Sequence, residues 1–292
     1  MLPATFKLCC GISHQHFKTM IGLKKTAVVA IARELRRMKK EKCLPSIINP
    51  LSQKGKISEA FRVEDDKLKR NSTLNTEELY YIKQGEEALL KAREILIQDA
   101  GWTTEIKMKN GDNVVSKVLP GTGKVFKLEA VLDATVEHVC SELHEKLEQM
   151  SSWNPSVKHI QILQKIGDKT IVTHEIMGET AGNIIGQRDF VSVRYFWKEG
   201  PCCYLAGIAT KSKLMPPQKG FVRAEIGPSC IILCPASNNN KKTQFIWLLS
   251  MDLKGWLPKS LINQALSQAQ VDLLNTCAHS SQPFVLHIQL NL

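Results

Sequence analysis

The order of the expected secondary-structure elements limits the fold of this chain more than any other feature. Between residues 102 and 252 the apolar runs have the alternation or length of β-strands, and one helix pattern, at 135–150, interrupts them. Strands that follow one another without crossover helices pair antiparallel. The sequence therefore predicts one long antiparallel sheet, with an Asn110-Gly111 hairpin turn after its first strand. Strands are expected at 102–109, 113–119, 124–132, 157–166, 169–177, 189–197, 202–210, 220–235 and 243–252.

Two further helices flank these strands. Asn75-x-x-Glu78 has the pattern of a capping box and opens a helix that reaches about Gln98. The last helix starts near Gly255 and Pro258, and its buried stripe includes Ile262, Leu266 and Leu273. A long antiparallel sheet curls, so a terminal amphipathic helix can close it and leave an apolar cavity. We therefore predict an α+β fold with a curved antiparallel sheet around an apolar tunnel, closed by the C-terminal helix.

The end of this helix is expected soon after Leu274. Residues 275–283 contain two serines and a proline and have the composition of a turn, because serine competes for backbone hydrogen bonds and proline cannot donate one. Residues 275–292 are therefore predicted to form an atypical tail to a folded domain that spans residues 73–292.

The net charge of +11 is concentrated at the N-terminus. Residues 1–42 hold ten Lys and Arg against two acidic residues, whereas residues 76–292 hold 23 basic and 22 acidic side chains. A nucleic-acid-binding protein would carry its basic patch on the folded domain. The nearly neutral domain argues against a nucleic-acid partner.

The basic N-terminus has an amphipathic helical pattern. Its apolar stripe consists of Phe17, Ile21, Val28, Ile31 and Leu35, and its remaining surface is basic and poor in acids. This pattern is typical of a mitochondrial presequence, which we assign to residues 1–62. A surface helix that binds anionic membranes permanently remains the alternative. No apolar run reaches the ~18 residues of a membrane span.

Motifs for catalysis or metal binding are missing from the sequence. Nine cysteines without a C-x-x-C pair or zinc spacing argue against a disulfide framework and a metal site. Residues 120–124 have two glycines before Lys124, but not in the register of a phosphate-binding loop. The histidines are scattered, and hydrogen-bonding or solvent-exposed roles are expected for them. We therefore expect neither a cofactor nor enzymatic activity.

Two charged residues interrupt otherwise apolar strands. Glu175 lies in the 169–177 strand, and Arg194 shares one face of the next strand with Phe190, Ser192 and Phe196. Consecutive strands are expected to pair, so the two charges can meet. An ion pair inside an apolar cavity is costly, and it would make sense if it orients the polar group of an apolar ligand. An ordinary outward cross-strand ion pair remains the alternative.

Several segments resemble the START family of lipid-transfer domains. They are Asp99–Trp102, the QGEEAL run from Gln84, GETAGNIIGQRDFV at 178–191 and FIWLLSMDLKGWLP at 245–258, and the similarity begins at Met1–Cys9. The resemblance implies a helix-grip fold, a sterol tunnel that holds cholesterol, delivery to mitochondria with action at the outer membrane, and no catalysis. It departs from the family at Gln187, where a proline is usual, and at Pro201 and Cys202, where a second phosphorylatable serine is expected.

The resemblance also assigns roles to individual residues. It implies that Glu175 and Arg194 form the buried pair near the sterol hydroxyl. Ser72, in a linker over 63–72, matches a serine that a basophilic protein kinase modifies, although Lys69 and Asn71 differ from the family pattern. The expected partners are therefore cholesterol, the outer membrane, the import machinery and this kinase, and the chain is expected to act as a monomer.

Release of the ligand requires a wall of the cavity to open. The glycine-rich loop with Gly178, Gly182 and Gly186 is predicted to move, together with the last helix. A sterol sensor or membrane tether without net transfer is the alternative function. A cyclase-like enzyme on a related fold would need a catalytic acid in the cavity, and Arg194 would hold Glu175 ionised.

Overall fold

The computed structural model describes residues 74–108, 112–179, 184–237 and 239–280, all of which belong to one compact unit. The predicted presequence, the linker with Ser72 and residues 281–292 lie outside the described residues.

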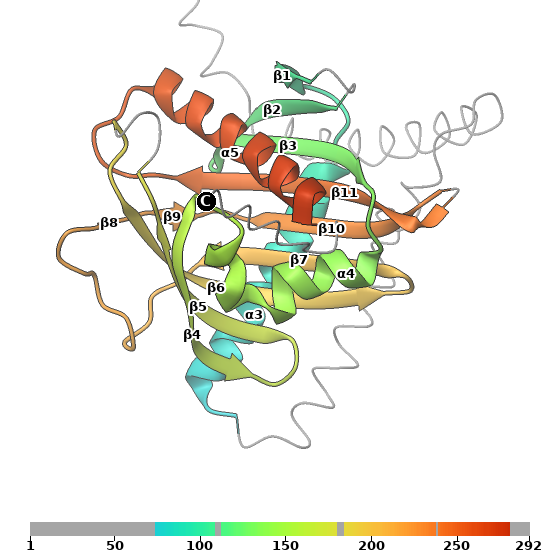
Figure 1. Cartoon of the computed structure of the whole chain (residues 1–292). Coiled ribbons are helices and arrows are strands. Elements are labelled where there is room, and N and C mark those ends of the chain that lie inside the picture. Colours follow the sequence, from blue (N-terminus) through green and yellow to red (C-terminus); the bar gives the residue numbers. More distant parts are fainter. Residues whose placement is uncertain (1–73, 109–111, 180–183, 238, 281–292) are drawn as a thin grey trace, which may run out of the picture. The chain divides into compact units, whose positions relative to one another are not determined.

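The described chain is built on one curved sheet of eleven strands (Figure 1). The order across the sheet is β1-β2-β3-β11-β10-β7-β6-β5-β4, with β8 beside β6 and β9 beside β11. The strands are β1 (Thr103–Lys107), β2 (Asn113–Leu119), β3 (Gly123–Leu132), β4 (Val157–Ile166), β5 (Thr170–Met177), β6 (Arg188–Glu199), β7 (Cys202–Ala209), β8 (Val222–Arg223), β9 (Glu225–Ile226), β10 (Ser229–Ala236) and β11 (Asn239–Asp252).

The predicted antiparallel sheet is confirmed, with two corrections. The segment expected as one strand at 220–235 forms three strands, β8, β9 and β10. In addition, β8 pairs with β6 in parallel. Gly227 separates β9 from β10 where the chain passes close to Ser250, since an added Cβ there would lie 2.3 Å from the Ser250 Oγ.

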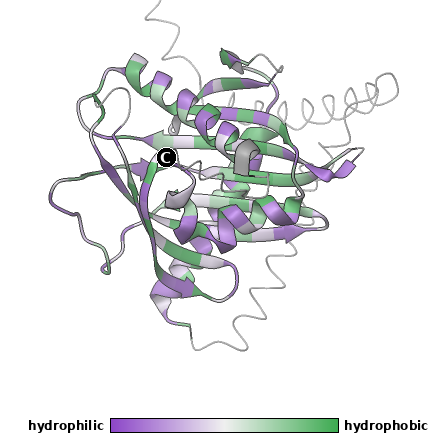
Figure 2. Cartoon of the chain, viewed as in Figure 1, coloured by the Kyte–Doolittle hydropathy of each residue, from purple (hydrophilic) through white to green (hydrophobic). Residues whose placement is uncertain are grey.

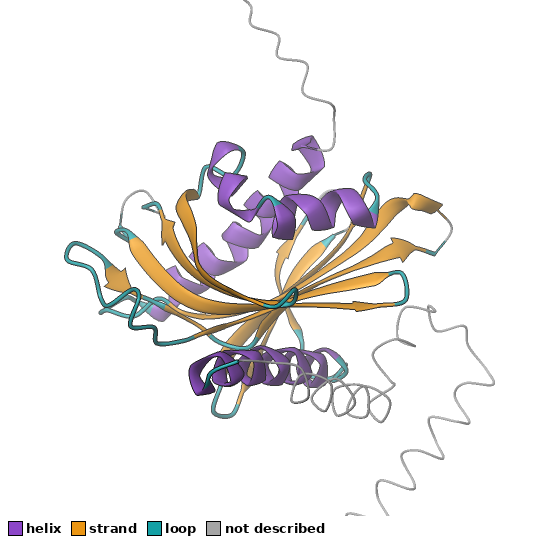
Figure 3. Ribbon diagram, turned by 90° about the horizontal axis from the view of Figure 1, so that it is seen from below, coloured by secondary structure: helices purple, strands orange, loops and turns teal. Residues whose placement is uncertain are grey.

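Helices cover both faces of the sheet (Figure 3). Helix α3 (Thr76–Leu96) begins with the predicted capping box and packs on one face against β6, β7 and β10. It approaches β6 closely at Gly85, where an added Cβ would lie 2.6 Å from the Cβ of Tyr195. Helix α5 (Lys259–Ser280) crosses the opposite face (Figure 1). Its polar and apolar residues alternate along its length, as expected for a helix with one buried side (Figure 2).

The helix expected at 135–150 is divided into three short pieces. These are α4 (Val136–Cys140), a π-helical turn η3 (Ser141–Glu145) and a 3₁₀ turn η4 (Leu147–Ser152). The amide of Lys146 donates to the carbonyl of Ser141, five residues earlier, and Lys146 itself leaves the helical region. The change of winding keeps both Leu147 and Met150 buried.

The expectation that the last helix ends near Leu274 is wrong. Helix α5 continues to Ser280, and Cys277 is buried. Cys277 follows Leu273 and Leu274 at helical spacing, so it extends the apolar stripe by one turn. The Thr276 hydroxyl donates to the carbonyl of Asp272, four residues earlier, a bond that a helix accommodates at a small cost. The polar residues at 275–283 predict a turn only if the apolar contribution of Cys277 is left out.

The expectation about cysteines also needs a correction. Cys202 of β7 and Cys234 of β10 form a disulfide, with their Cα atoms 4.4 Å apart. The neighbouring residues Cys203 and Leu233 are paired in the sheet, which brings the two cysteines opposite each other. Their spacing of 32 residues says nothing about this register, so the bridge could not be predicted.

Candidate functional site

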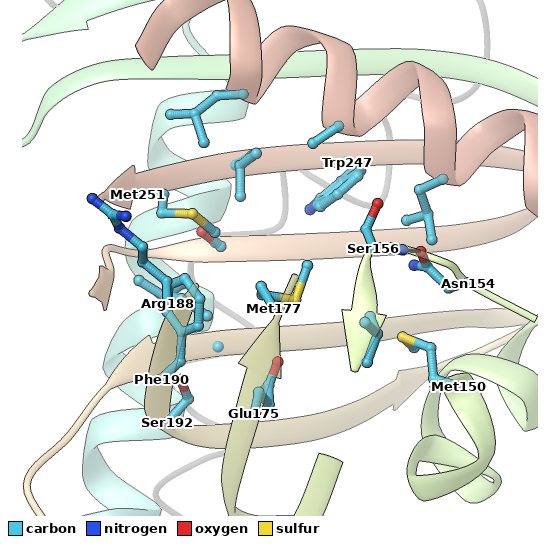
Figure 4. A pocket seen from close by; sticks show the side chains of 18 of the residues that line it. Met150, Asn154, Ser156, Glu175, Met177, Arg188, Phe190, Ser192, Trp247 and Met251 are labelled. Carbon is cyan, nitrogen blue, oxygen red and sulfur yellow. Dashed lines mark hydrogen bonds between the residues drawn. The ribbon is translucent and has the colours of Figure 1, made fainter. Parts of the chain in front are cut away.

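A cavity of about 210 Å³ lies between the sheet and helix α5 (Figure 4). Since one buried water needs about 10–15 Å³ on a comparable measure, the cavity has room for a ligand far larger than water. Most of its wall is apolar and comes from β5, β6, β7, β10, β11 and α5. The apolar side chains include Leu143, Met150, Met177, Phe190, Leu205, Ile231, Trp247, Leu249, Met251, Leu266, Ala269 and Leu273.

Glu175 and Arg194 meet in the wall of this cavity. The Arg194 Nε donates to the Glu175 Oε1 at 3.0 Å, and the Nη2 donates to the Oε2 at 2.7 Å. Glu175 pairs with Phe190 in the sheet, and the Arg194 side chain reaches back along β6 to it. Both residues line the cavity, so the outward-facing alternative is wrong.

The carboxylate of Glu175 is held in its ionised form. Burial raises its pKa, but the charge and hydrogen bonds of Arg194 and a hydrogen bond from the Thr173 hydroxyl more than compensate. The net effect is a pKa below the ordinary value for glutamate. A carboxylate in this state is a poor general acid, and it gives the cavity one charged but internally neutralised region.

Arg188 lies at the start of β6 and lines the cavity, and all of its hydrogen bonds go to backbone carbonyls. It donates to Gly186 at 2.7 Å, to Leu253 at 3.1 Å and to Lys254 at 3.4 Å. Burial lowers the pKa of the guanidinium. Arg188 therefore joins the end of the 178–186 loop to the connection between β11 and α5. Arg188 stands within one of the segments that resemble the family, but the sequence alone predicts no role for it.

A second buried cluster of charged and polar side chains, which the sequence does not predict, is centred on Asp189. Asp189, which is fully buried, accepts hydrogen bonds from the Arg223 Nε and Nη2 at 3.0 and 2.7 Å, and its Oδ2 lies 3.1 Å from the His174 Nε2. Burial raises the pKa of Asp189, and the bonds from Arg223 and His174 lower it below its ordinary value. Arg223 also donates to the carbonyls of Met215 and Pro216. The cluster holds the segment after β7 against the sheet. It also gives His174 a structural role, as a hydrogen-bond partner of Asp189.

Only some of the residues predicted to gate the cavity lie in its described wall. Gly178, Gly186, Leu266 and Leu273 line it. Ile262 packs against the hydrophobic core but is not part of the described cavity wall. Gly182 lies outside the described residues.

The described ranges contain neither a candidate metal site nor a helix that could span a membrane. No group of three or more His, Cys, Asp and Glu side chains in these ranges is placed to hold a metal ion. None of the described helices combines the length and hydropathy that crossing a membrane requires.

Comparison with known proteins identifies the family. The START domain model matches residues 82–284, and the chain belongs to the START domain family. Among solved structures, the human StAR-related lipid transfer protein 5 has a TM-score of 0.63 at 20% identity, covering 70% of this chain and 97% of that one. Human STARD10 has a TM-score of 0.58 at 18% identity, covering 66% and 78%. These structures support the helix-grip fold.

Nearer relatives are steroidogenic acute regulatory proteins. The protein of that name from Xenopus laevis is 54% identical over 273 residues, which is 93% of each chain. The human steroidogenic acute regulatory protein, mitochondrial, is 49% identical over 276 residues, or 94% of each chain. The similarity therefore extends well beyond the lipid-binding domain.

Proposed function

We propose that this chain binds cholesterol in the cavity and mediates its transfer into mitochondria, from the outer to the inner membrane, to supply steroid hormone synthesis. The observation that carries this proposal is the similarity to steroidogenic acute regulatory proteins. About half of the residues are identical over nearly the full length of the chain, and several of these relatives are named as mitochondrial. The largely apolar cavity with the Glu175–Arg194 ion pair in its wall supports it, since a sterol is an apolar body with one hydroxyl.

The energetics of burial favour a carrier whose cavity can open. Burying roughly 600 Å² of apolar sterol surface at ~25 cal/mol/Å² yields on the order of 15 kcal/mol before the costs of association. Such a ligand leaves slowly unless part of the wall moves. Helix α5, with Leu266 and Leu273 in the wall and Ile262 beside it, and the loop containing Gly178, Gly182 and Gly186 are the parts that we propose to move.

Two exposed apolar side chains support membrane contact at this moving end. Ile184, on the 178–186 loop, is 67% exposed, and Trp256, between β11 and α5, is 97% exposed. Arg188 joins the segments that carry them. Apolar side chains left exposed in this way are available for contact with a membrane or a partner. We propose that the cavity opens here when the chain meets the mitochondrial outer membrane.

The N-terminal residues are proposed to direct and regulate the chain. Residues 1–62 act as a presequence read by the import machinery, and comparing import of the full chain with that of residues 63–292 into isolated mitochondria tests this. Ser72 receives a phosphate from a basophilic kinase, and the absence of labelling at Ser72 in the full chain would contradict it. The folded domain acts as a monomer that binds its ligand without converting it.

Transfer between vesicles distinguishes a carrier from a sensor or tether. Donor vesicles containing labelled cholesterol are mixed with unlabelled acceptor vesicles and a small amount of the full chain. We expect each chain to move many cholesterol molecules, because an opening cavity releases its ligand and can be loaded again. If labelled cholesterol is bound by the chain but does not accumulate in the acceptors, the protein is a sensor or tether.

A further inference from the structure

Ser192 has an unused hydroxyl in the wall of the cavity. It lies on β6 between Phe190 and Arg194, is fully buried, and lines the cavity (Figure 4). Its Oγ has no hydrogen-bond partner among the described residues. A buried hydroxyl without a partner costs free energy, so its presence in the wall needs an explanation.

Two other polar residues of the wall, Glu175 and Ser229, are already engaged. Both oxygens of Glu175 accept hydrogen bonds from Arg194, and one also accepts from Thr173. The Ser229 hydroxyl donates to the carbonyl of Ser250 and accepts from its amide. Among the described wall residues, Ser192 is the one with a fully buried side-chain atom left unpartnered.

We propose that Ser192 forms the direct hydrogen bond to the ligand's hydroxyl. This inference rests on the proposed sterol-binding function and identifies the atom that recognises the polar end. The atoms of Glu175 and Arg194 that bond each other are committed to charge-assisted hydrogen bonds, which are roughly twice as strong as neutral ones, whereas the Ser192 Oγ has no partner among the described residues. A hydroxyl can donate to or accept from Ser192 without breaking any bond in the described wall.

The ion pair then has a positioning role. The Thr173 hydroxyl, which donates to Glu175, also lies 3.4 Å from the Ser192 carbonyl, so the cluster contacts the backbone that carries the anchor. Thr173 and Ser192 are also directly paired across β5 and β6. The Glu175–Arg194 pair fixes the geometry of the polar end of the cavity, and Ser192 forms the hydrogen bond to the hydroxyl of the ligand.

The test compares two ligands and two variants of the full chain. Cholesterol and 5-cholestene, the same skeleton without the hydroxyl, are delivered in cyclodextrin and compete with a fluorescent sterol. We expect the unsubstituted chain to bind cholesterol about tenfold more tightly than cholestene, as one hydrogen bond allows. Ser192→Ala should lose this preference, because its affinity for cholesterol should fall about tenfold while its affinity for cholestene stays unchanged. Ser116→Ala is the control and should keep the preference, since Ser116 is buried on β2 outside the described cavity wall and its hydroxyl is engaged with Glu105.

Thermal unfolding of the ligand-free proteins adds a second readout. Ser192→Ala should unfold at the same temperature as the unsubstituted chain or higher, because it removes a hydroxyl without a partner. A Ser192→Ala variant that still prefers cholesterol tenfold would overturn the assignment and leave the proposed function intact. If the unsubstituted chain binds neither ligand, the proposed function fails and this inference fails with it.

Discussion

Arg194→Leu is expected to lower the free energy of unfolding by about 3–5 kcal/mol and to abolish sterol binding, because it leaves a buried carboxylate without its cation. The Glu175 side chain is 7% exposed, whereas that of Arg194 is 28% exposed. Glu175→Leu should therefore cost less, since the remaining guanidinium can still reach water. Urea unfolding and binding of a fluorescent cholesterol analogue measure the two effects.

The pH dependence of the Arg194→Leu effect follows from the carboxylate. With Arg194 present, the pKa of Glu175 is lowered, so the pair's stabilisation is present above the unfolded pKa and is lost as pH falls through the folded pKa. Without Arg194, burial should raise the folded pKa above the unfolded value, and the carboxyl becomes protonated more easily. The stability difference between the two proteins should therefore narrow as pH is lowered toward about 4.

Replacing both residues separates stability from binding. The variant carrying Glu175→Leu and Arg194→Leu has no unpaired charge and should regain most of the lost stability, as buried pairs replaced by apolar residues often do. It should not regain sterol binding to the same extent, because the polar end of the cavity is gone. Arg93 and Glu199, 3.0 Å apart between α3 and β6, provide the control, and leucines there should leave sterol binding unchanged. Single variants at 175 and 194 with unaltered stability and binding would contradict this account.

Arg188→Met is expected to speed sterol release at least tenfold and to cost about 2–4 kcal/mol of stability, since hydrogen bonds to charged groups are worth more than neutral ones. Methionine keeps an apolar stem but cannot bond the carbonyls of Gly186, Leu253 and Lys254. The loop and the α5 connection then separate more easily. Stopped-flow fluorescence of a bound sterol analogue gives the dissociation rate.

The control for Arg188 is its neighbour in space, Lys254. Its ammonium forms ion pairs with Glu225 and Asp252 at the surface, and ion pairs exposed to solvent contribute little to stability. Lys254→Met should therefore leave the dissociation rate unchanged. Equal dissociation rates for Arg188→Met and the unsubstituted chain would show that this end of the cavity is not where the ligand leaves.

The parts of the fold that the sequence predicts well are those set by local periodicity. Alternation in β5 and β6 places Glu175 and Arg194 on the inner face, and the stripe through Leu266 and Leu273 turns α5 toward the sheet. Antiparallel pairing follows from the lack of crossover helices. The sheet and the lid need only near neighbours in the chain, so both could be predicted from it, whereas only the structure decides that the ion pair faces the cavity.

The missed features depend on register and on backbone partners. Arg188 bonds carbonyls up to 66 residues away, and backbone carbonyls carry no sequence signal. The Cys202–Cys234 bridge depends on the pairing of β7 with β10. The unpartnered hydroxyl of Ser192 can be recognised only in the folded structure, where its buried Oγ has no partner among the described residues. At the end of α5 the polar composition predicts a turn, but the helix continues because Cys277 packs into the core.

Sterol binding by a chain whose cavity has been filled tests the central claim most directly. Ala269 of α5 lines the cavity, and Ala269→Trp would place an indole in the space proposed for the ligand. Gln264→Trp, on the exposed side of the same helix, is the matched control. In a titration with a fluorescent cholesterol analogue, the unsubstituted chain and Gln264→Trp should each bind one sterol that cholesterol displaces, and Ala269→Trp should bind none. If a folded Ala269→Trp chain binds the sterol as the unsubstituted chain does, the ligand does not occupy this cavity.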